Sequence, residues 1–497
     1  MKTAIIVVAL MGALASWASD ATTTLVETES VRIRFDAVGR PLEWVACLRE
    51  RSGRPTGSLC RHFLSVVDAD HSGVPAGLSD PGEPVRHWRE DGPERMQIGF
   101  ESVRSSGERL RQTYELTPGT YGVRYAVEVS GVAGSGSGLH YNLSTDSAFR
   151  PSPMPGFSAG YAGVRRVRID AAGETRLDDS EDWPAAVESE QWAGVRSRFW
   201  ALLASPSSES GGLTGAAGEQ TGNLTLTPRD SAATSMSLTL YSGPVDRLAL
   251  SQQGGGLSEL LFAHLWWWLK PVSSGLLLML DAIQRVVGNA GLAIMTLSVA
   301  VKLLMWPVTR LAERLQARVD QQRSILQPAI DKAKEGFRGE ERHERILAVY
   351  RDHGISPWYP MKSLIGYAIQ IPVFIAAFAM LGENIALSGV PWLWVEDLAR
   401  PDALVPMPFH IPFFGGDLNL LPWLMTLLTV VAAAIHQDPH LNPVMLKGRR
   451  RQLYFLAALF LVLFYTFPAA MVLYWTTNNL LHLVGSLLGR TVAAGRA

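Results

Sequence analysis

Residues 452–489 read QLYFLAALFLVLFYTFPAAMVLYWTTNNLLHLVGSLLG and contain no Asp, Glu, Lys or Arg. A helix needs about 20 apolar residues to cross a hydrocarbon core about 30 Å thick, so this stretch is too long for one crossing. Because proline interrupts helices, Pro468 divides it into two predicted spans, residues 452–467 and 468–489. The C-terminal part of the chain is therefore predicted to be membrane-embedded helix.

Three earlier apolar stretches complete a predicted bundle of five spans, at residues 288–306, 364–382 and 418–435. The connections between the spans differ in charge. Residues 309–362 carry eleven Lys or Arg against eight Asp or Glu, whereas residues 383–417 carry one basic and five acidic residues. Since cytoplasmic loops have an excess of Lys and Arg, the first connection is predicted to be cytoplasmic and the second external. The C-terminus then lies in the cytoplasm.

The first 19 residues have the composition of an export signal. Lys2 precedes an apolar run at positions 4–14, and small residues surround Ala18. This order is typical of a secretory signal peptide, whose apolar run is shorter than a membrane span. An uncleaved anchor over residues 1–19 is the alternative. Either segment exports the domain that follows.

Residues 20–251 are predicted to form that exported domain, an antiparallel β-sandwich. Segments such as 30–35 and 121–129 alternate apolar and polar side chains, and Gly, Pro, Asp and Ser interrupt the pattern between them. Period-two alternation is typical of strands with one buried face and one solvated face. The predicted fold class is thus a multidomain membrane protein, in which a β-sandwich precedes a five-span α-helical bundle.

The two cysteines, Cys47 and Cys60, both lie in the predicted exported domain. An oxidising compartment permits a disulfide between them. Two unpaired buried thiols are the alternative, because the sequence gives no distance between the sulfur atoms.

Residues 257–287 join the two parts and are predicted to form two amphipathic helices in the outer membrane interface. Pro271 is expected to separate the two helices. The three consecutive tryptophans at 266–268 have the amphipathic rings that are enriched at the level of lipid headgroups.

The cytoplasmic connection has a helical pattern of its own. Leu311 and Leu315 recur at helical spacing, and Gly336 and Gly339 signal a turn. We therefore expect a helical hairpin over residues 309–350. The hairpin has two interpretations, a docking site for a ribosome, targeting factor or client, and a solvated structural element.

Lys302 is the only charged residue within the five predicted spans. A charge at the centre of a span costs about 2.5 to 3.5 kcal/mol on insertion scales, so Lys302 is a candidate functional residue. A lysine that extends to the cytoplasmic headgroups is the alternative. Polar residues of the spans could line a wet inner-leaflet groove with it, although each alone is equally explained by an interhelical hydrogen bond. These residues are Thr296, Ser298, Gln370, Thr426, Thr429, Thr476, Thr477, Asn478 and Asn479.

Signals of enzyme chemistry are weak in this sequence. It contains no phosphate-binding loop and no HExxH pattern. His436 and His440 are four residues apart, but Asp438-Pro439 between them interrupts any helix that would place both on one metal ion. We therefore expect no enzymatic activity, no cofactor and no metal site.

Five ordered landmarks resemble those of the YidC/Oxa/Alb insertases. They are GNAGLAI at 288–294, PVT at 307–309, LQP at 326–328, IQIPVF at 369–374 and PAAMVLYWTTNN at 468–479. The sequence YSGP at 241–244 is also similar to the end of the periplasmic domain of Gram-negative YidC proteins. The resemblance thus extends over nearly the whole chain.

In that family a five-helix core encloses a hydrophilic groove that is open to the cytoplasm and the lipid and closed on the outer side. The resemblance implies that Lys302, where the family usually has arginine, attracts the acidic or polar segment of a client. It also implies that the apolar segment leaves between residues 364–382 and the final span. The residues that this implies for the exit are Ile371, Pro372, Phe374, Tyr474 and Trp475.

The resemblance further implies a membrane protein insertase and chaperone that works without nucleotide hydrolysis. It implies nascent membrane proteins as clients, the ribosome and the Sec translocon as candidate partners, the lipid bilayer as surroundings and no direct nucleic-acid partner. The expected location is the bacterial inner membrane, with several spans, a large N-terminal domain in the periplasm and a cytoplasmic C-terminus.

Three departures from the family pattern suggest a divergent paralogue. The first membrane segment resembles a cleavable signal instead of a retained helix. Lysine at 302 lacks the fixed fork of donors of an arginine, and SPWYPMK at 356–362 replaces a Gly-Cys-Leu-Pro-like stretch. The main alternative function is a membrane-anchored periplasmic assembly or scaffold protein. A small-solute transporter is a weaker alternative, because the spans show no internal repeat.

Overall fold

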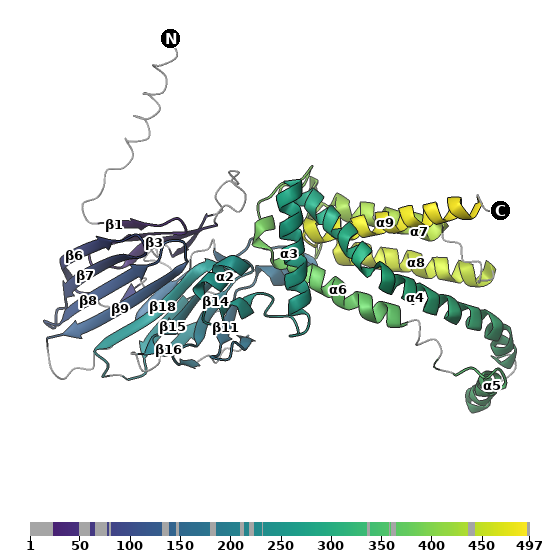
Figure 1. Cartoon of the computed structure of the whole chain (residues 1–497), viewed down its shortest axis with the longest axis horizontal. Coiled ribbons are helices and arrows are strands. Elements are labelled where there is room, and N and C mark those ends of the chain that lie inside the picture. Colours follow the sequence, from purple (N-terminus) through teal and green to yellow (C-terminus); the bar gives the residue numbers. More distant parts are fainter. Residues whose placement is uncertain are drawn as a thin grey trace, which may run out of the picture. The chain divides into compact units, whose positions relative to one another are not determined.

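The computed structural model describes the chain from residue 23 to residue 494 with short internal gaps, so the predicted signal peptide or anchor at 1–19 lies outside the described residues. The gaps are 49–59, 65–76, 79–80, 132–138, 146–148, 179–184, 209–212, 218–222, 231, 335–337, 357, 359–363 and 436–442. The chain divides into two compact units (Figure 1). One consists of residues 1–152 with 161–264, and the other of residues 153–160 with 265–497.

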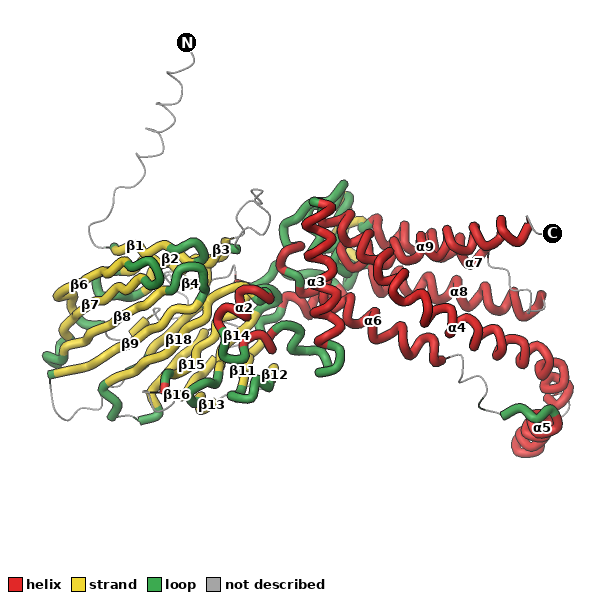
Figure 2. The backbone as a smooth tube through the Cα atoms, viewed as in Figure 1, coloured by secondary structure: helices red, strands yellow, loops and turns green. Residues whose placement is uncertain are grey.

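The first unit is built from antiparallel β-sheets (Figure 2). Its largest sheet has nine strands in the order β12-β11-β14-β15-β18-β9-β8-β7-β6, and neighbouring strands pair antiparallel. The strands are β6 (Glu83–Asp91), β7 (Met96–Val103), β8 (Arg109–Leu116), β9 (Gly122–Ser130), β11 (Arg165–Ile169), β12 (Thr175–Asp178), β14 (Trp192–Arg196), β15 (Trp200–Pro206) and β18 (Ser235–Pro244).

Two smaller sheets complete this unit. One has the order β1-β2-β3-β4 and the other the order β13-β16-β17-β10-β5. Their strands are β1 (Thr24–Glu27), β2 (Val31–Phe35), β3 (Pro41–Cys47), β4 (Cys60–Leu64), β5 (Gly77–Leu78), β10 (Tyr141–Ser144), β13 (Ala185–Val187), β16 (Leu213–Ala217) and β17 (Asn223–Pro228).

Aromatic rings from all three sheets share one core. Phe35 of β2 lies 4.6 Å from Tyr114 of β8, and Tyr125 of β9 lies 4.3 Å from Tyr141 of β10, measured between ring centroids. The hydroxyl of Tyr114 donates to the Gly39 carbonyl over 2.9 Å, so its polar end is satisfied in the core. Fully burying such a side chain contributes about 1.5 to 3 kcal/mol, which explains how these sheets hold together.

The cysteines lie opposite each other on adjacent strands. Cys47 ends β3, Cys60 begins β4, and the two are register partners. Cys47 is disulfide-bonded, and Cys60 is the only other cysteine in the sequence.

The segment between the β-sheets and the helices differs from the two amphipathic helices predicted for residues 257–287. After α2 (Arg247–Gln253), only a short 3-10 turn, η4 (Leu257–Leu260), precedes α3 (Lys270–Val287). The first predicted helix is therefore absent from this described segment. Pro271 lies in the first turn of α3, where its missing N–H breaks no hydrogen bond, so it begins a helix.

The second unit is mainly helical (Figure 1). A two-stranded hairpin that the sequence did not predict, β19 and β20, precedes α7. Besides α3, the elements are η2 (Gly156–Ala162, which runs two residues into the first unit), α4 (Ala290–Lys334), α5 (Gly339–Asp352), α6 (Leu364–Glu383), η6 (Ile385–Leu387), β19 (Val405–Ile411), β20 (Gly415–Leu418), α7 (Leu420–Ile435), α8 (Pro443–Phe464) and α9 (Ala469–Ala494).

Helix α4 is a single helix of 45 residues that includes Pro307 and Pro328. The sequence predicted a span followed by a separate hairpin, whereas the first hairpin helix continues the span without a break. Strong helix formers such as Leu, Ala, Arg and Gln surround both prolines and offset their cost of about 3 kcal/mol each. The buried residues Val319, Leu326 and Ile330 then pack against α5.

Among the described residues, one helix is long and apolar enough to cross a membrane, at Ala290–Val319. Two shorter apolar helices follow at Gln370–Glu383 and Leu420–Ile435. The five-span arrangement as a whole stays a prediction.

Candidate functional site

Two side chains of α4 reach backbone carbonyls of α9. The Ser298 hydroxyl donates to the Tyr474 carbonyl over 3.3 Å, and the Lys302 ammonium lies 3.5 Å from the Asn478 carbonyl. The contacts advance by four residues on both helices, so α4 and α9 run side by side in the same direction.

Lys302 lies at the edge of the packed face of α4. Val301 beside it is buried, whereas Leu303 and Leu304 are 69% and 66% exposed. The Lys302 side chain is itself half-buried and turns toward α9. The ammonium is therefore directed at the backbone of the neighbouring helix.

A second polar contact joins α9 to α7. The Asn479 amide donates to the Thr429 hydroxyl oxygen over 2.9 Å and approaches the Met425 carbonyl at 3.4 Å. Consecutive residues of a helix lie about 100° apart around its axis. Asn478 contacts α4 and Asn479 contacts α7, so the two residues lie on different sides of α9. The structure thus gathers polar groups of α4, α7 and α9 around one helix.

The threonines in these helices donate their hydroxyl protons back along their own helices. Thr426 donates to Pro422 and Thr476 to Val472, over 2.8 and 2.7 Å. Thr429 and Thr477 donate in the same way to the carbonyls four residues before them. Their oxygen lone pairs remain able to accept, so these residues present acceptors to their surroundings.

Two predicted groove residues lie elsewhere. Thr296 is exposed beside Leu292. It precedes Lys302 by six residues, which places the two side chains about 240° apart around the axis of α4. Gln370 is exposed on α6. By contrast, Ser298 is only about 40° from Lys302 on the same helix, so helical geometry alone could have separated Ser298 from Thr296.

Two of the five residues implied for the client exit, Phe374 and Trp475, belong to an aromatic cluster of α6, α8 and α9. Phe374 and Trp475 meet edge to face, with ring centroids 4.7 Å apart. Tyr474 is buried, Ile371 is 52% exposed and Pro372 lies inside α6. Sequence reasoning missed three further rings of this cluster, although pairs of aromatics four residues apart could have indicated them. They are Phe378, Phe460 and Phe464.

A buried carboxylate that the sequence did not reveal lies at the N-terminus of α7. One oxygen of Asp402 accepts from the backbone N–H groups of Leu420 and Leu421, over 2.6 and 2.9 Å, and from the Trp394 indole over 3.1 Å. Asp402 thereby caps the first turn of α7. Burial raises the pKa of this carboxyl above its usual value, and the hydrogen bonds that it accepts oppose the shift.

The comparisons with known proteins agree on one family. Residues 282–493 match the family described as 60Kd inner membrane protein. Proteins named "Membrane protein insertase YidC" match over most of the chain. Residues 282–493 form a domain of the YidC/Oxa family. The resemblance predicted from the sequence landmarks is therefore confirmed.

Three YidC relatives show how far the similarity extends. The Ralstonia nicotianae protein is 26% identical over 95% of this chain and 85% of its own length. The Prosthecochloris aestuarii protein is 24% identical over 74% of this chain, and the Syntrophobacter fumaroxidans protein is 30% identical over 50% of it. The chain spans only 64% and 42% of the length of these last two relatives.

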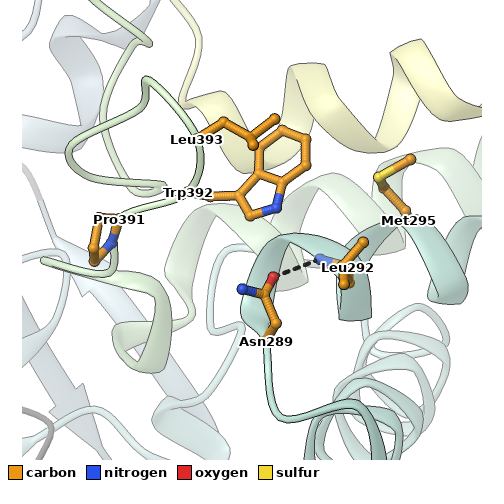
Figure 3. A pocket seen from close by; sticks show the side chains of 6 residues that line it. All are labelled: Asn289, Leu292, Met295, Pro391, Trp392 and Leu393. Carbon is orange, nitrogen blue, oxygen red and sulfur yellow. Dashed lines mark hydrogen bonds between the residues drawn. The ribbon is translucent and has the colours of Figure 1, made fainter.

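A cavity of about 770 Å³ lies beside the N-terminal turns of α4, away from the polar contacts between α4 and α9. Figure 3 shows Trp392 lying over the first turns of α4, with Asn289 capping the Leu292 N–H. Lys302 is ten residues beyond Leu292, about 15 Å along the helix. The cavity is lined by Asn289, Leu292, Met295, Pro391, Trp392 and Leu393.

Two further features of the described residues bear on enzyme chemistry. Residues 156–160 read GFSAG, the spacing of a nucleophile elbow, but an elbow serine is exposed, whereas Ser158 is fully buried in a 3-10 helix. Across the described ranges, no three His, Cys, Asp or Glu side chains group closely enough to hold a metal ion.

Proposed function

We propose that this chain is a membrane protein insertase and chaperone that moves client segments into the inner membrane through a polar groove beside α9. The observation that carries this proposal is the position of Lys302, which is half-buried and directed at the Asn478 carbonyl of α9. Ser298 and the Asn479–Thr429 contact add polar groups on both sides of that helix. The YidC names of the relatives support the same function.

The proposed groove lowers the cost of carrying a polar segment into the membrane. A carboxylate about 4 Å from the Lys302 ammonium gains about 4 kcal/mol at the effective dielectric of a protein surface. This is comparable to the cost of about 2.5 to 3.5 kcal/mol for a charge at the centre of a span. The threonine and asparagine oxygens accept hydrogen bonds from water or from backbone N–H groups of the client.

Transfer of the apolar client segment into lipid then drives insertion. Each Å² of apolar surface removed from water contributes about 25 cal/mol, so no nucleotide hydrolysis is required. The proposed exit lies between α6 and α9, beside the Phe374–Trp475 contact. The aromatic cluster there fills the exit until a client replaces its ring contacts.

The proposed topology follows from the loop charges. It has five spans, a periplasmic β-unit and a cytoplasmic hairpin formed by the end of α4 with α5. The hairpin is the proposed docking site for a ribosome or targeting factor, and the Sec translocon is a proposed partner for larger clients. Of the 14 residues of α5, all of which are described, none is fully buried, so the outer face of α5 is available.

The test compares Lys302→Ala and Lys302→Arg on paired clients that differ only in the charge of a short translocated tail. We expect the arginine variant to insert both clients, and the alanine variant to insert the acidic-tailed client several-fold less than the neutral one. Thr296→Val is the matched control, because it removes a polar group from another face of the same helix. Site-specific crosslinking from α9 to ribosome-bound nascent chains provides an independent readout.

If the alanine variant inserts both clients equally well, the alternative interpretation is favoured, in which Lys302 extends to the cytoplasmic headgroups. Full insertion by that variant without any nascent-chain crosslink to α9 would favour the scaffold function instead.

A further inference from the structure

The helical unit is discontinuous in sequence. Residues 153–160 lie between β10 and β11 along the chain, yet they belong to the same compact unit as residues 265–497. Met154 and Ser158 of this segment are buried, 5% and 0% exposed. A surface loop exposes its side chains, so this burial shows that the segment packs on something.

The segment packs on the outer hairpin β19–β20. The rings of Phe157 and Phe413 meet edge to face at 4.8 Å. A Cβ atom placed on Gly415 would lie 3.0 Å from the Pro155 ring, so this ring packs on the hairpin about as closely as a glycine allows. Phe413 also has a positive φ of 73°, an uncommon conformation that this packing compensates.

The same segment reaches the turn between α8 and α9. Gly156 has φ +61°, and a Cβ added there would lie 2.8 Å from both the Phe413 carbonyl oxygen and the Thr466 hydroxyl. Thr466 is fully buried. A side chain at 156 would therefore force the segment, the hairpin and the turn apart.

The hairpin and the turn are joined beneath the segment by a polar network. The Tyr465 hydroxyl donates to the Asp417 carbonyl over 3.1 Å, and the Asn419 amide donates to the Tyr465 carbonyl over 2.7 Å. Phe414 stacks edge to face on Tyr465 at 5.5 Å. Residues 153–160 thus cover the junction of two loops that connect four helices.

We propose that residues 153–160 act as an outer strap, which holds the β19–β20 hairpin against the α8–α9 turn and keeps the outer end of the bundle closed. The surface that receives the strap is formed by Phe413, Gly415 and Thr466, and its occupant is this segment of the same chain. The role of the strap in keeping the groove closed on the outer side rests on the proposed insertase function. The packing of the strap on the hairpin and the turn does not depend on that function. A truncation that starts at residue 257 removes this piece of the helical unit.

Docking is tested by cysteine crosslinking in the full chain in membranes. Phe157→Cys combined with Phe413→Cys should crosslink with a short bifunctional reagent. The matched control is Gly160→Cys with Phe413→Cys, because a Cβ at Gly160 meets no atom within 4 Å. We expect at least a five-fold greater crosslinked fraction for the first pair, and equal fractions would overturn the proposal.

Closure is tested by labelling Thr466→Cys with a membrane-impermeant maleimide from the outer side. The cysteine at position 466 should react slowly with the maleimide in a chain with an intact strap and in one that also carries Gly160→Ala. It should react at least ten-fold faster in a chain that carries Gly156→Ala. Equal rates for the two alanine variants would refute closure by the strap. These rates do not depend on client insertion, so a failure of the strap is distinguishable from a failure of the insertase function.

Discussion

Removing the buried carboxylate of Asp402 at the N-terminus of α7 should destabilise the helical unit. In the Asp402→Ala variant, the N–H groups of Leu420 and Leu421 and the Trp394 indole lose an acceptor that lies 2.6 to 3.1 Å away. Each buried donor left unsatisfied costs about 1 to 3 kcal/mol. Water that enters the space of the lost side chain can accept from some of these donors. We therefore expect the free energy of unfolding to fall by about 2 to 4 kcal/mol.

Asp402→Asn is the matched control, because its amide oxygen still accepts from the same donors. The free energy of unfolding of this variant should fall by less than about 1 kcal/mol, because good helix caps differ little in stability. The assay is thermal or denaturant unfolding of the purified full chain in detergent, followed by fluorescence. Our reasoning about this cap is refuted if the alanine variant unfolds at the same midpoint as the asparagine variant.

The same carboxyl gives a pH dependence with a defined sign. Burial raises the pKa of Asp402 above its usual value of 3.8, so the folded chain binds this proton more readily than the unfolded chain. The contribution of Asp402 to stability therefore falls as pH rises from the unfolded pKa through the folded pKa. The wild-type chain should lose stability relative to Asp402→Asn over that interval. A constant difference between the two proteins across it would contradict the cause that we assign.

Three further measurements address other parts of the chain. A double-mutant cycle of Asn479→Ala and Thr429→Val should give a coupling of about 0.6 kcal/mol, the average for interhelical hydrogen bonds in a membrane, and zero coupling would remove the α7–α9 contact from the proposed groove. Cys47→Ser should destabilise the β-unit by about 2 to 4 kcal/mol in unfolding assays under oxidising conditions, and match the wild type once reductant is added. Amides of α5 should exchange with deuterium at least ten-fold faster than amides of α9, because α5 buries no residue completely; equal protection would indicate a partner surface on α5.

The sequence predicted those features that depend on local pattern. Alternation in segments such as 121–129 indicated strands, and β9 there buries every second residue over its first six. The uncharged stretch around Pro468 likewise corresponds to α8 and α9, with the proline just before α9. Ser298 could be grouped with Lys302, because both lie on one face of a helix.

Features that depend on distant parts of the chain were not predictable from pattern. The carboxylate of Asp402 is recognisable only when the N-terminus of α7 and the indole of Trp394 surround it. The strap at 153–160 and the hairpin that it covers are about 250 residues apart along the chain. No periodicity links such segments, since their association depends on packing in three dimensions.

The unbroken course of α4 has a mechanical consequence. A helix of 45 residues is about 67 Å long, and each turn is hydrogen-bonded to the next, so a rotation applied at Lys334 is transmitted toward Lys302. Pro307 and Pro328 lie between these two residues and lack the N–H that would bond the preceding turn, so bending is concentrated at these two positions. Torque and tilt are therefore transmitted differently along α4. A partner that twists the C-terminal part of α4 would reorient the ammonium of Lys302 relative to α9, whereas a partner that only bends this part would leave that ammonium in place.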